Sequence, residues 1–247
     1  MFKKRLEIPA VFAAIMMTAS SAQAMHIMEG FLPPSACIVW GIVCLPFLMI
    51  GIRKIKRLLA ENPPAITILA MAGAFTFALS ALKIPSVTGS SSHMTGLGFA
   101  AILFGPSVAC VLALIVLLFQ ALLLAHGGLT TLGANTLSMG IVGPILAYMI
   151  YVTMCKTTLP RSVAVFSAAA LGALATYVMT SLQLALVYPS KIGGVTASFM
   201  KFAAIFAVTQ IPLAIIEGIL TVVLVNIVIK YGDEIIKSFE KEKLSYE

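Results

Sequence analysis

Charge is the property that this sequence has least of. Only 10% of its 247 residues are charged, whereas 60% are hydrophobic, and the mean hydropathy is +1.07. Because about a quarter of the residues in a soluble domain are charged, this composition predicts a protein that crosses the membrane several times. The net charge of +7 then reports topology before it reports an acidic partner. Basic stripes interleaved with aromatic residues are also lacking, so nucleic acid is not an expected partner.

Common enzyme motifs are missing as well. The sequence has no P-loop GxxxxGK[ST], and it has neither HExxH nor GxSxG. The chain is therefore not expected to hydrolyse ATP itself, nor to be a metalloprotease or serine hydrolase of the common kinds. The four cysteines lie in or beside apolar runs without CxxC spacing, which is typical of small buried residues. We expect that the chain is not an enzyme and that it holds no resident cofactor.

The first 24 residues have the three parts of a signal peptide. A basic start that includes Lys3 and Arg5 precedes an apolar stretch at residues 8–21, and Ala22 and Ala24 then form the small-x-small pattern that signal peptidase cleaves. The apolar stretch is short for a span of about 20 residues, which argues against the alternative of an uncleaved signal anchor. We predict a signal peptide at 1–24, a transmembrane metal-binding domain at 25–230 and a cytoplasmic tail at 231–247.

Long apolar stretches predict the crossings. Six are long enough to cross, and they cover residues 35–52, 62–82, 107–125, 136–154, 162–188 and 202–229. Residues 97–104 form a seventh, short stretch after the irregular sequence SVTGSSSHMTG. Non-helical backbone at membrane depth persists only where protein or a cavity surrounds it. That sequence is therefore expected to belong to a central site.

Basic residues decide whether the short stretch crosses. If it does, ten Lys and Arg fall on one side, namely Arg53, Lys54, Lys56, Arg57, Lys156, Arg161, Lys230, Lys237, Lys241 and Lys243, against Lys83, Lys191 and Lys201 on the other. Since basic loops stay in the cytoplasm, the predicted fold is an all-α polytopic membrane protein. It is a seven-helix transmembrane bundle with a short or irregular third crossing, an outside mature N-terminus and a cytoplasmic C-terminus. In the sixth predicted span, small residues recur at positions 164, 168, 172 and 176, a face for close packing either inside the bundle or against a partner subunit.

Cleavage after Ala24 would turn Met25 into a metal ligand. Its α-amine would have a pKa of about 7.7–8.0, and with the backbone nitrogen and imidazole of His26 it could chelate one ion. His93, in the irregular loop, is the better fourth ligand, and His126 could support it or replace it. A plane of four nitrogens favours Ni(II) or Cu(II).

Polar residues near these histidines could orient the imidazoles. Ser92 and Asn135 are the main candidates. Glu217 is the one formal charge inside a predicted span, which makes it a functional candidate. It could equally pair with Lys83 or cap broken backbone. If Glu217 were a general base, the chain could instead be a membrane-embedded metalloenzyme.

The stretches MHIMEGFLPP, LKIPSVTGSSSHMTG, AHGGLTTLGAN and IPLAIIEGILT resemble the CbiM family over about residues 25–226. These proteins are the substrate-binding membrane components of energy-coupling-factor cobalt transporters, and NikM nickel proteins are close relatives. The resemblance implies a seven-helix bundle with an inserted N-terminus, and metal held by Met25, His26 and His93. MHIMEGF resembles the cobalt branch, whereas nickel relatives tend to read MHIPDGF. The expected cargo is therefore Co²⁺ for cobalamin biosynthesis, with Ni²⁺ as the alternative.

The same resemblance implies partners in the cell membrane. They are a small accessory membrane subunit, a transmembrane coupling subunit and cytoplasmic ATPase subunits. Family members often begin directly at the methionine that corresponds to Met25. The upstream signal is a departure from that pattern, and an uncleaved signal would block the amine.

Overall fold

A computed structural model describes residues 26–82, 84–85 and 91–244, with the backbone alone described at 84, 85, 91 and 232–244. The predicted signal peptide, Met25 and Lys83 lie outside the described residues. Within the described residues the fold is helical, apart from a two-residue antiparallel ladder between β1 (Ile84–Pro85) and β2 (Ser91–Ser92). The ladder belongs to the irregular segment that precedes the short apolar stretch at 97–104.

The helices follow the predicted apolar stretches one by one. In chain order they are α2 (Pro34–Glu61), α3 (Ala65–Ala81), α4 (Leu97–Phe104), α5 (Pro106–Leu123), α6 (Leu132–Asn135), the π-helix η1 (Thr136–Val142), α7 (Gly143–Met154), α8 (Arg161–Val187) and α9 (Gly194–Leu244). Because α6, η1 and α7 run on as one helix, Leu132–Met154, the described part of the chain contains seven helical segments. The all-α prediction is thereby confirmed.

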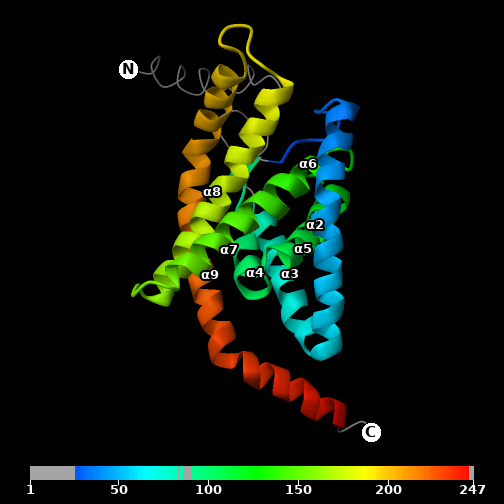
Figure 1. Ribbon diagram of the computed structural model, residues 1–247, viewed down its shortest axis with the longest axis vertical. Helices are drawn as coiled ribbons and strands as arrows, with labels where there is room; N and C mark the ends of the chain where they lie inside the picture. Colours follow the sequence, from blue (N-terminus) through cyan, green and yellow to red (C-terminus); the bar gives the residue numbers. More distant parts are fainter. Residues whose placement is uncertain (1–25, 83, 86–90, 245–247) are drawn as a thin grey trace, which may run out of the picture.

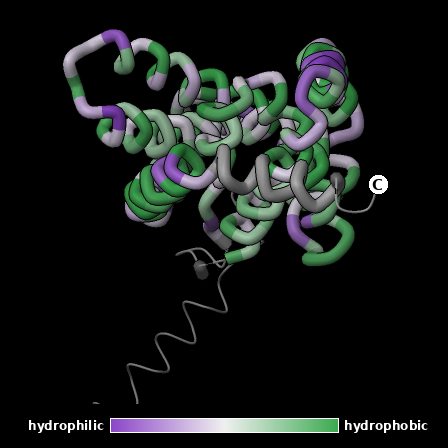
Figure 2. Tube along the Cα trace, turned by 90° about the horizontal axis from the view of Figure 1, so that it is seen from below, coloured by the Kyte–Doolittle hydropathy of each residue, from purple (hydrophilic) through white to green (hydrophobic). Residues whose placement is uncertain are grey.

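Five of these segments are long and apolar enough to cross a membrane: Pro34–Glu61, Pro106–Leu123, Leu132–Met154, Arg161–Val187 and Gly194–Tyr231. The outward surfaces of the helices are apolar, as at Ile38, Ile42 and Leu122. Figure 2 shows hydrophobic residues along most of the helical trace and hydrophilic residues in only a few short stretches. An apolar exterior of this kind suits contact with lipid. The protein is therefore a multi-pass membrane protein.

The short helix α4 lies inside the bundle (Figure 1). All six residues from Leu97 to Ile102 are buried, as expected for a helix that is apolar on every face. At Gly98, a Cβ would lie 2.9 Å from Cα of Ala169 in α8, so the two helices pack with almost no side chain between them. This position allows α4 and the loop before it to reach the centre of the protein.

The small residues of α8 pack inside the bundle. Ala164, Ala168 and Thr176 are buried, and a Cβ at Gly172 would lie 2.8 Å from Cβ of Ala147 in α7. A Cβ at Gly143 of α7 would in turn lie 2.3 Å from Oγ1 of Thr176. This small-residue face, 164–176, is thus a contact between α7 and α8, which is the first of the two alternatives.

The two ends of the molecule differ in which elements they contain (Figure 1). The C-terminal end of α2, the turn between α7 and α8 and the C-terminal part of α9 all lie in the lower half of the view. The loop between α8 and α9 and the N-terminal end of α2 lie at the opposite end. The elements that carry the three predicted cytoplasmic basic clusters therefore share one end of the protein.

Candidate metal centre

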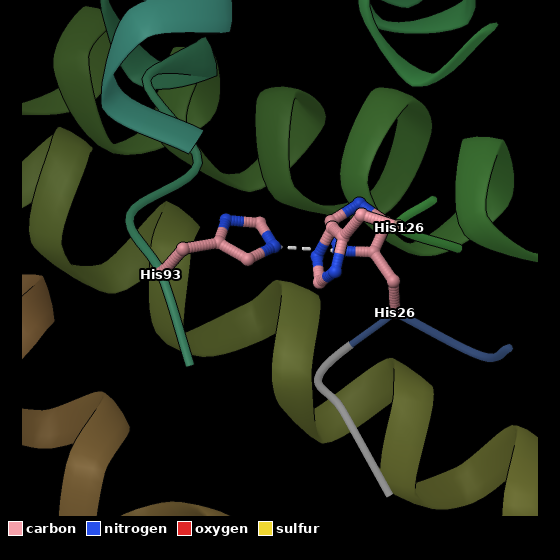
Figure 3. Close-up of side chains that lie close together, drawn as sticks. All are labelled: His26, His93 and His126. Atoms are coloured by element: carbon pink, nitrogen blue, oxygen red, sulfur yellow. Dashed lines mark hydrogen bonds between the residues drawn. The ribbon is translucent and has the colours of Figure 1, made fainter. Parts of the chain in front are cut away.

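Three histidines from distant parts of the sequence meet inside the bundle (Figure 3). His26 comes from the segment before α2, His93 from the loop between β2 and α4, and His126 from the loop between α5 and α6. Their exposed fractions are 2%, 0% and 5%. One ligand atom from each lies within 4.8 Å of the others. The structure thus brings together all three histidines of the sequence.

His93 and His26 are the closest pair. Nε2 of His93 lies 2.6 Å from Nδ1 of His26, as the dashed line in Figure 3 marks. Two imidazole nitrogens bound at right angles to one ion, each at about 2.0 Å, would lie about 2.8 Å apart. The other ring nitrogen of His93, Nδ1, lies 2.7 Å from the carbonyl oxygen of Met94. A proton on Nδ1 that binds this carbonyl leaves the lone pair on Nε2, directed at the cluster.

His126 lies only slightly farther from the two rings of this pair than they lie from each other. Its ring centroid is 4.8 Å from that of His26 and 4.9 Å from that of His93, against 4.5 Å between His26 and His93. Its backbone N–H donates to the carbonyl of Gln120 in α5 at 3.1 Å, and Ala125 before it has a positive φ of 46°. The sequence ranked His126 below His93, and the structure places both in the cluster.

Asn135 holds the segment that carries His26. Its Oδ1 accepts from the N–H of Ile27 at 2.8 Å, and its Nδ2 donates to the carbonyl of Ile27 at 3.0 Å. The hydroxyl of Thr131 donates to the same carbonyl at 2.7 Å. The predicted support from Asn135 therefore reaches the backbone beside His26. Both side chains are buried, so the backbone groups of Ile27 are hydrogen-bonded to Asn135 and Thr131 and not to water.

The loop between α5 and α6 wraps around the same segment. The N–H of Glu29 donates to the carbonyl of Gly127 at 3.2 Å, and a carboxylate oxygen of Glu29 accepts from the N–H of Thr130 at 3.1 Å. Hydrogen bonds from Thr130 hold the pKa of Glu29 below its usual value, so this carboxylate is ionised at neutral pH. Glu29 thus helps to pin the segment at the surface.

Ser92 and Glu217 lie on opposite sides of the contact between α9 and the segment of His93. Ser92 belongs to β2, directly before His93, and Glu217 belongs to α9. The hydroxyls of Ser92 and Thr209 lie 2.7 Å apart, so Ser92 faces α9 in this contact. Glu217 accepts hydrogen bonds from Thr95 and Gly96. It thus caps broken backbone, which was one of the alternatives that the sequence left open for Glu217. Thr95 and Thr209 were not singled out from the sequence, because nothing in the sequence indicates which loop α9 touches.

The cluster is suited to bind a transition metal ion. Imidazole is a ligand for Zn, Cu, Fe and Ni, and the group of potential ligands found among the described residues consists of the three histidines. Both oxygens of Glu217 are occupied by Thr95 and Gly96, which does not suit a general base. Fold and site therefore define a class, the multi-pass membrane proteins with a buried cluster of histidines that could bind a transition metal ion.

Within that class, the chain belongs to the CbiM family. Its residues 26–235 match the family profile described as the cobalt uptake substrate-specific transmembrane region. It is 58% identical to the cobalt transport protein CbiM of Kyrpidia tusciae over 215 residues, 87% of each chain. It is 60% identical to the CbiM of Chlorobium limicola over 214 residues, 87% of this chain and 84% of that one. This family transports cobalt, so the chain is a transport protein and not an enzyme.

Two solved structures share the fold. One, a truncated transition metal transporter, superposes with a TM-score of 0.72 at 26% identity and covers 83% of this chain and 99% of that chain. The other, a transition metal transporter, has a TM-score of 0.73 at 25% identity and covers 84% and 94%. The relatives are named for cobalt, and the nickel alternative gains no support from them.

Proposed function

We propose that this protein is the substrate-capture subunit of an ATP-driven energy-coupling-factor importer of Co²⁺, and that it supplies cobalamin biosynthesis. The observation that carries the proposal is the 2.6 Å approach of Nε2 of His93 to Nδ1 of His26 within a buried group of three histidines. Two nitrogen ligands of one ion need this proximity, and burial keeps competing water away. The names of the relatives support cobalt as the cargo.

The amine of Met25 completes the proposed site. Cleavage after Ala24 would leave Met25 as the first residue, directly before the buried His26. Consecutive Cα atoms are about 3.8 Å apart, so the amine would lie within chelating reach of the His26 backbone nitrogen and imidazole. The hydrogen bonds of Asn135 to Ile27 support this arrangement, since they hold the start of the mature chain at the cluster.

The chain crosses the membrane seven times in this proposal, with α4 as the short third crossing. The second crossing, α3, has 17 residues and is shorter than the stretch predicted at 62–82. The mature N-terminus lies outside and the C-terminus lies in the cytoplasm. The grouping of the C-terminal parts of α2 and α9 with the α7–α8 turn at one end (Figure 1) supports this orientation, because these segments carry the ten basic residues expected inside. The histidines then take metal from the outer side.

Import against a gradient needs partners, because the sequence has no P-loop. The proposed partners are a small accessory membrane subunit, a transmembrane coupling subunit and cytoplasmic ATPase subunits. The capture subunit supplies specificity, and ATP hydrolysis by the partners drives release to the cytoplasm.

His26→Ala tests the proposed function. The change removes an imidazole ligand, so it should weaken Co²⁺ binding by more than the roughly 10- to 100-fold that loss of a supporting residue costs. Binding would be measured on the mature protein, with N-terminal sequencing to establish its first residue, and uptake with the partners co-expressed. Cys155→Ser, at the exposed α7–α8 turn, is the control and should bind normally. Undiminished cobalt uptake by His26→Ala would rule out the proposal.

The amine and the cargo each need a further measurement. If cleavage still follows Ala24, one alanine inserted between Ala24 and Met25 moves the histidine to the third position of the mature chain, which changes the ring geometry of the chelate. Wild-type affinity in that protein would argue against the amine as a ligand. Competition between Co²⁺ and Ni²⁺ on the purified protein should favour cobalt, and a preference for nickel would refute the assignment of the cargo.

A further inference from the structure

The three histidines are held by two different parts of the protein. The segment of His26 is fixed by Asn135 and Thr131, and the backbone of His126 is bonded to α5. These supports all belong to α5, α6 and the loop that joins them. His93 lies in another segment, between β2 and α4, and the hydrogen bonds of its neighbours lead to α9 and α3. A metal bound by the cluster would therefore bridge two separately supported halves.

Glu217 is the main anchor of the His93 loop. One carboxylate oxygen accepts from the N–H of Thr95 at 2.6 Å. The other accepts from the hydroxyl of Thr95 at 2.6 Å and from the N–H of Gly96 at 2.8 Å. Glu217 is 1% exposed. Three short bonds to one buried carboxylate are strong by the standards of protein hydrogen bonds, so the backbone two residues after His93 is tightly tied to α9.

Two more residues of α9 extend this contact to the other side of His93. Thr209 is bonded to Ser92 at 2.7 Å, and Leu213 packs in a buried cluster with Met94. Thr209, Leu213 and Glu217 are four residues apart, so they lie on one face of the helix. This clamp face, Thr209, Leu213 and Glu217, therefore contacts the residue before His93 and the three residues after it.

Helix α3 supports the loop from another direction. The hydroxyl of Thr76 donates to the carbonyl of Gly96 at 3.2 Å. Gly96 has a φ of +69°, and a Cβ there would lie 2.8 Å from Cα of Thr76. Because α3 leaves the loop no room on this side, the loop can move away only if α9 moves or releases it. The loop of His93 is thus held between α3 and α9.

We propose that the clamp face of α9 positions His93 as a metal ligand, and that release of the loop by α9 lets the metal dissociate. The inference rests on the proposed function, because it takes the histidines as the ligands. Glu217 and Thr209 are positioning residues that do not touch the ion. Helix α9 continues from the clamp to the end of the molecule that carries the basic clusters (Figure 1). A partner acting there could shift α9 and so withdraw His93 from His26.

Glu217→Gln is the sharpest variant. The amide has the same shape, but its NH₂ group must face one of the N–H donors, so at most two of the three bonds can survive. We expect Co²⁺ affinity to fall about 10- to 100-fold, as for other residues that support metal ligands, and to do so mainly through faster dissociation. Thr209→Val removes the neutral hydrogen bond to Ser92, together with a longer one to the carbonyl of Phe206 within α9, and should cost roughly 3- to 10-fold.

Thr221→Val is the matched control for Thr209→Val. Thr221 is buried on the same helix, and its hydroxyl has no hydrogen-bond partner within the described residues. The two substitutions are chemically identical, and of the two hydroxyls that of Thr209 is the one hydrogen-bonded to the segment of His93. Wild-type affinity and dissociation rate are expected for Thr221→Val. Equal losses in both variants would overturn the proposal.

A double-mutant cycle separates positioning from general structural damage. If Glu217 acts through His93, Glu217→Gln should have no further effect on Co²⁺ affinity once His93→Ala is present. An equal effect in both backgrounds would overturn the clamp and leave the proposed function intact. The same cycle with Thr209→Val decides the matter if Glu217→Gln does not fold. Loss of cobalt binding in His26→Ala with an unchanged affinity in His93→Ala would refute the clamp and remove His93 from the proposed site, whereas cobalt capture through His26 would stand.

Discussion

Gly128 shows how closely the α5–α6 loop approaches the segment that carries His26. A Cβ at this position would lie 2.5 Å from Cα of Glu29, and at Gly127 it would lie 3.7 Å from Cβ of His26. Gly127 also has a φ of +75°, a conformation that favours glycine. The two glycines after His126 therefore let the α5–α6 loop lie directly on the segment of His26.

Gly128→Ala should weaken metal binding. The added methyl group must push the segment at Glu29 away, and the displacement would be passed to His26 three residues earlier. We expect Co²⁺ affinity to fall by about 10-fold or more, on the scale of other losses of ligand support. Calorimetric titration of the mature protein measures it. Leu129→Ala, at an exposed position of the same loop, is the control, and a loss there as large as in Gly128→Ala would contradict the steric account.

The sequence predicted the histidines better than their supports. His26 follows from the chelate that a free amine at Met25 would form, and His93 from an irregular, uncharged loop at membrane depth. A ligand must carry a coordinating atom, so the few histidines of the sequence are conspicuous. A support such as Thr209 needs only a hydroxyl at the right place in space. Which of many buried hydroxyls has that place depends on packing between distant helices, and no local pattern encodes it.

At the scale of elements, spacing predicted close packing but not the partner. Small residues four apart in α8 give a face without bulky side chains, and α7 or another subunit could equally use it. The structure decides for α7, because Gly143 and Gly172 themselves form the crossing. The close approach needs small residues on both helices, and Gly143 supplies the second half.

Gly172→Ala should destabilise the fold, although alanine is the better helix former. Its Cβ would lie 2.8 Å from Cβ of Ala147 and 3.0 Å from the carbonyl oxygen of Gly143, and overpacking of this kind costs about 1–3 kcal/mol. For a chain of this size that corresponds to a fall of roughly 2–12 °C in the unfolding temperature, measured in detergent. Gly41→Ala in α2, where the Cβ meets nothing within 4 Å, should leave the temperature unchanged or raise it. A fall in both variants would count against the packing argument.

The ends of the helices were predicted less well than their existence. The apolar stretch at 35–52 ends at Arg53, whereas α2 continues to Glu61, because Lys and Arg are good helix formers outside the membrane as well. Helix α9 likewise runs from Gly194 to Leu244, beyond the predicted 202–229 on both sides. Hydropathy marks where lipid begins and ends, and a helix does not have to end there.

For the whole molecule, the central feature is the separation of the metal site from the basic end. The clusters at the end of α2, at the α7–α8 turn and along the tail share one end in Figure 1. If that end is cytoplasmic, α9 connects the clamp on the His93 loop with the surface on which partners would act. The proposed release mechanism therefore depends on the orientation of the chain, and that orientation can be measured directly.

Cys155 provides the measurement. It is exposed at the α7–α8 turn, whereas Cys44 and Cys110 are buried and Cys37 is half-buried. In a variant with the other three cysteines changed to alanine, a membrane-impermeant maleimide should label Cys155 in inside-out vesicles and not in intact cells. Ile192→Cys, introduced into the α8–α9 loop of a chain without Cys155, should show the reverse, since Ile192 is 87% exposed at the opposite end. Labelling of Cys155 from outside would invert the topology and place the basic end away from any cytoplasmic ATPase.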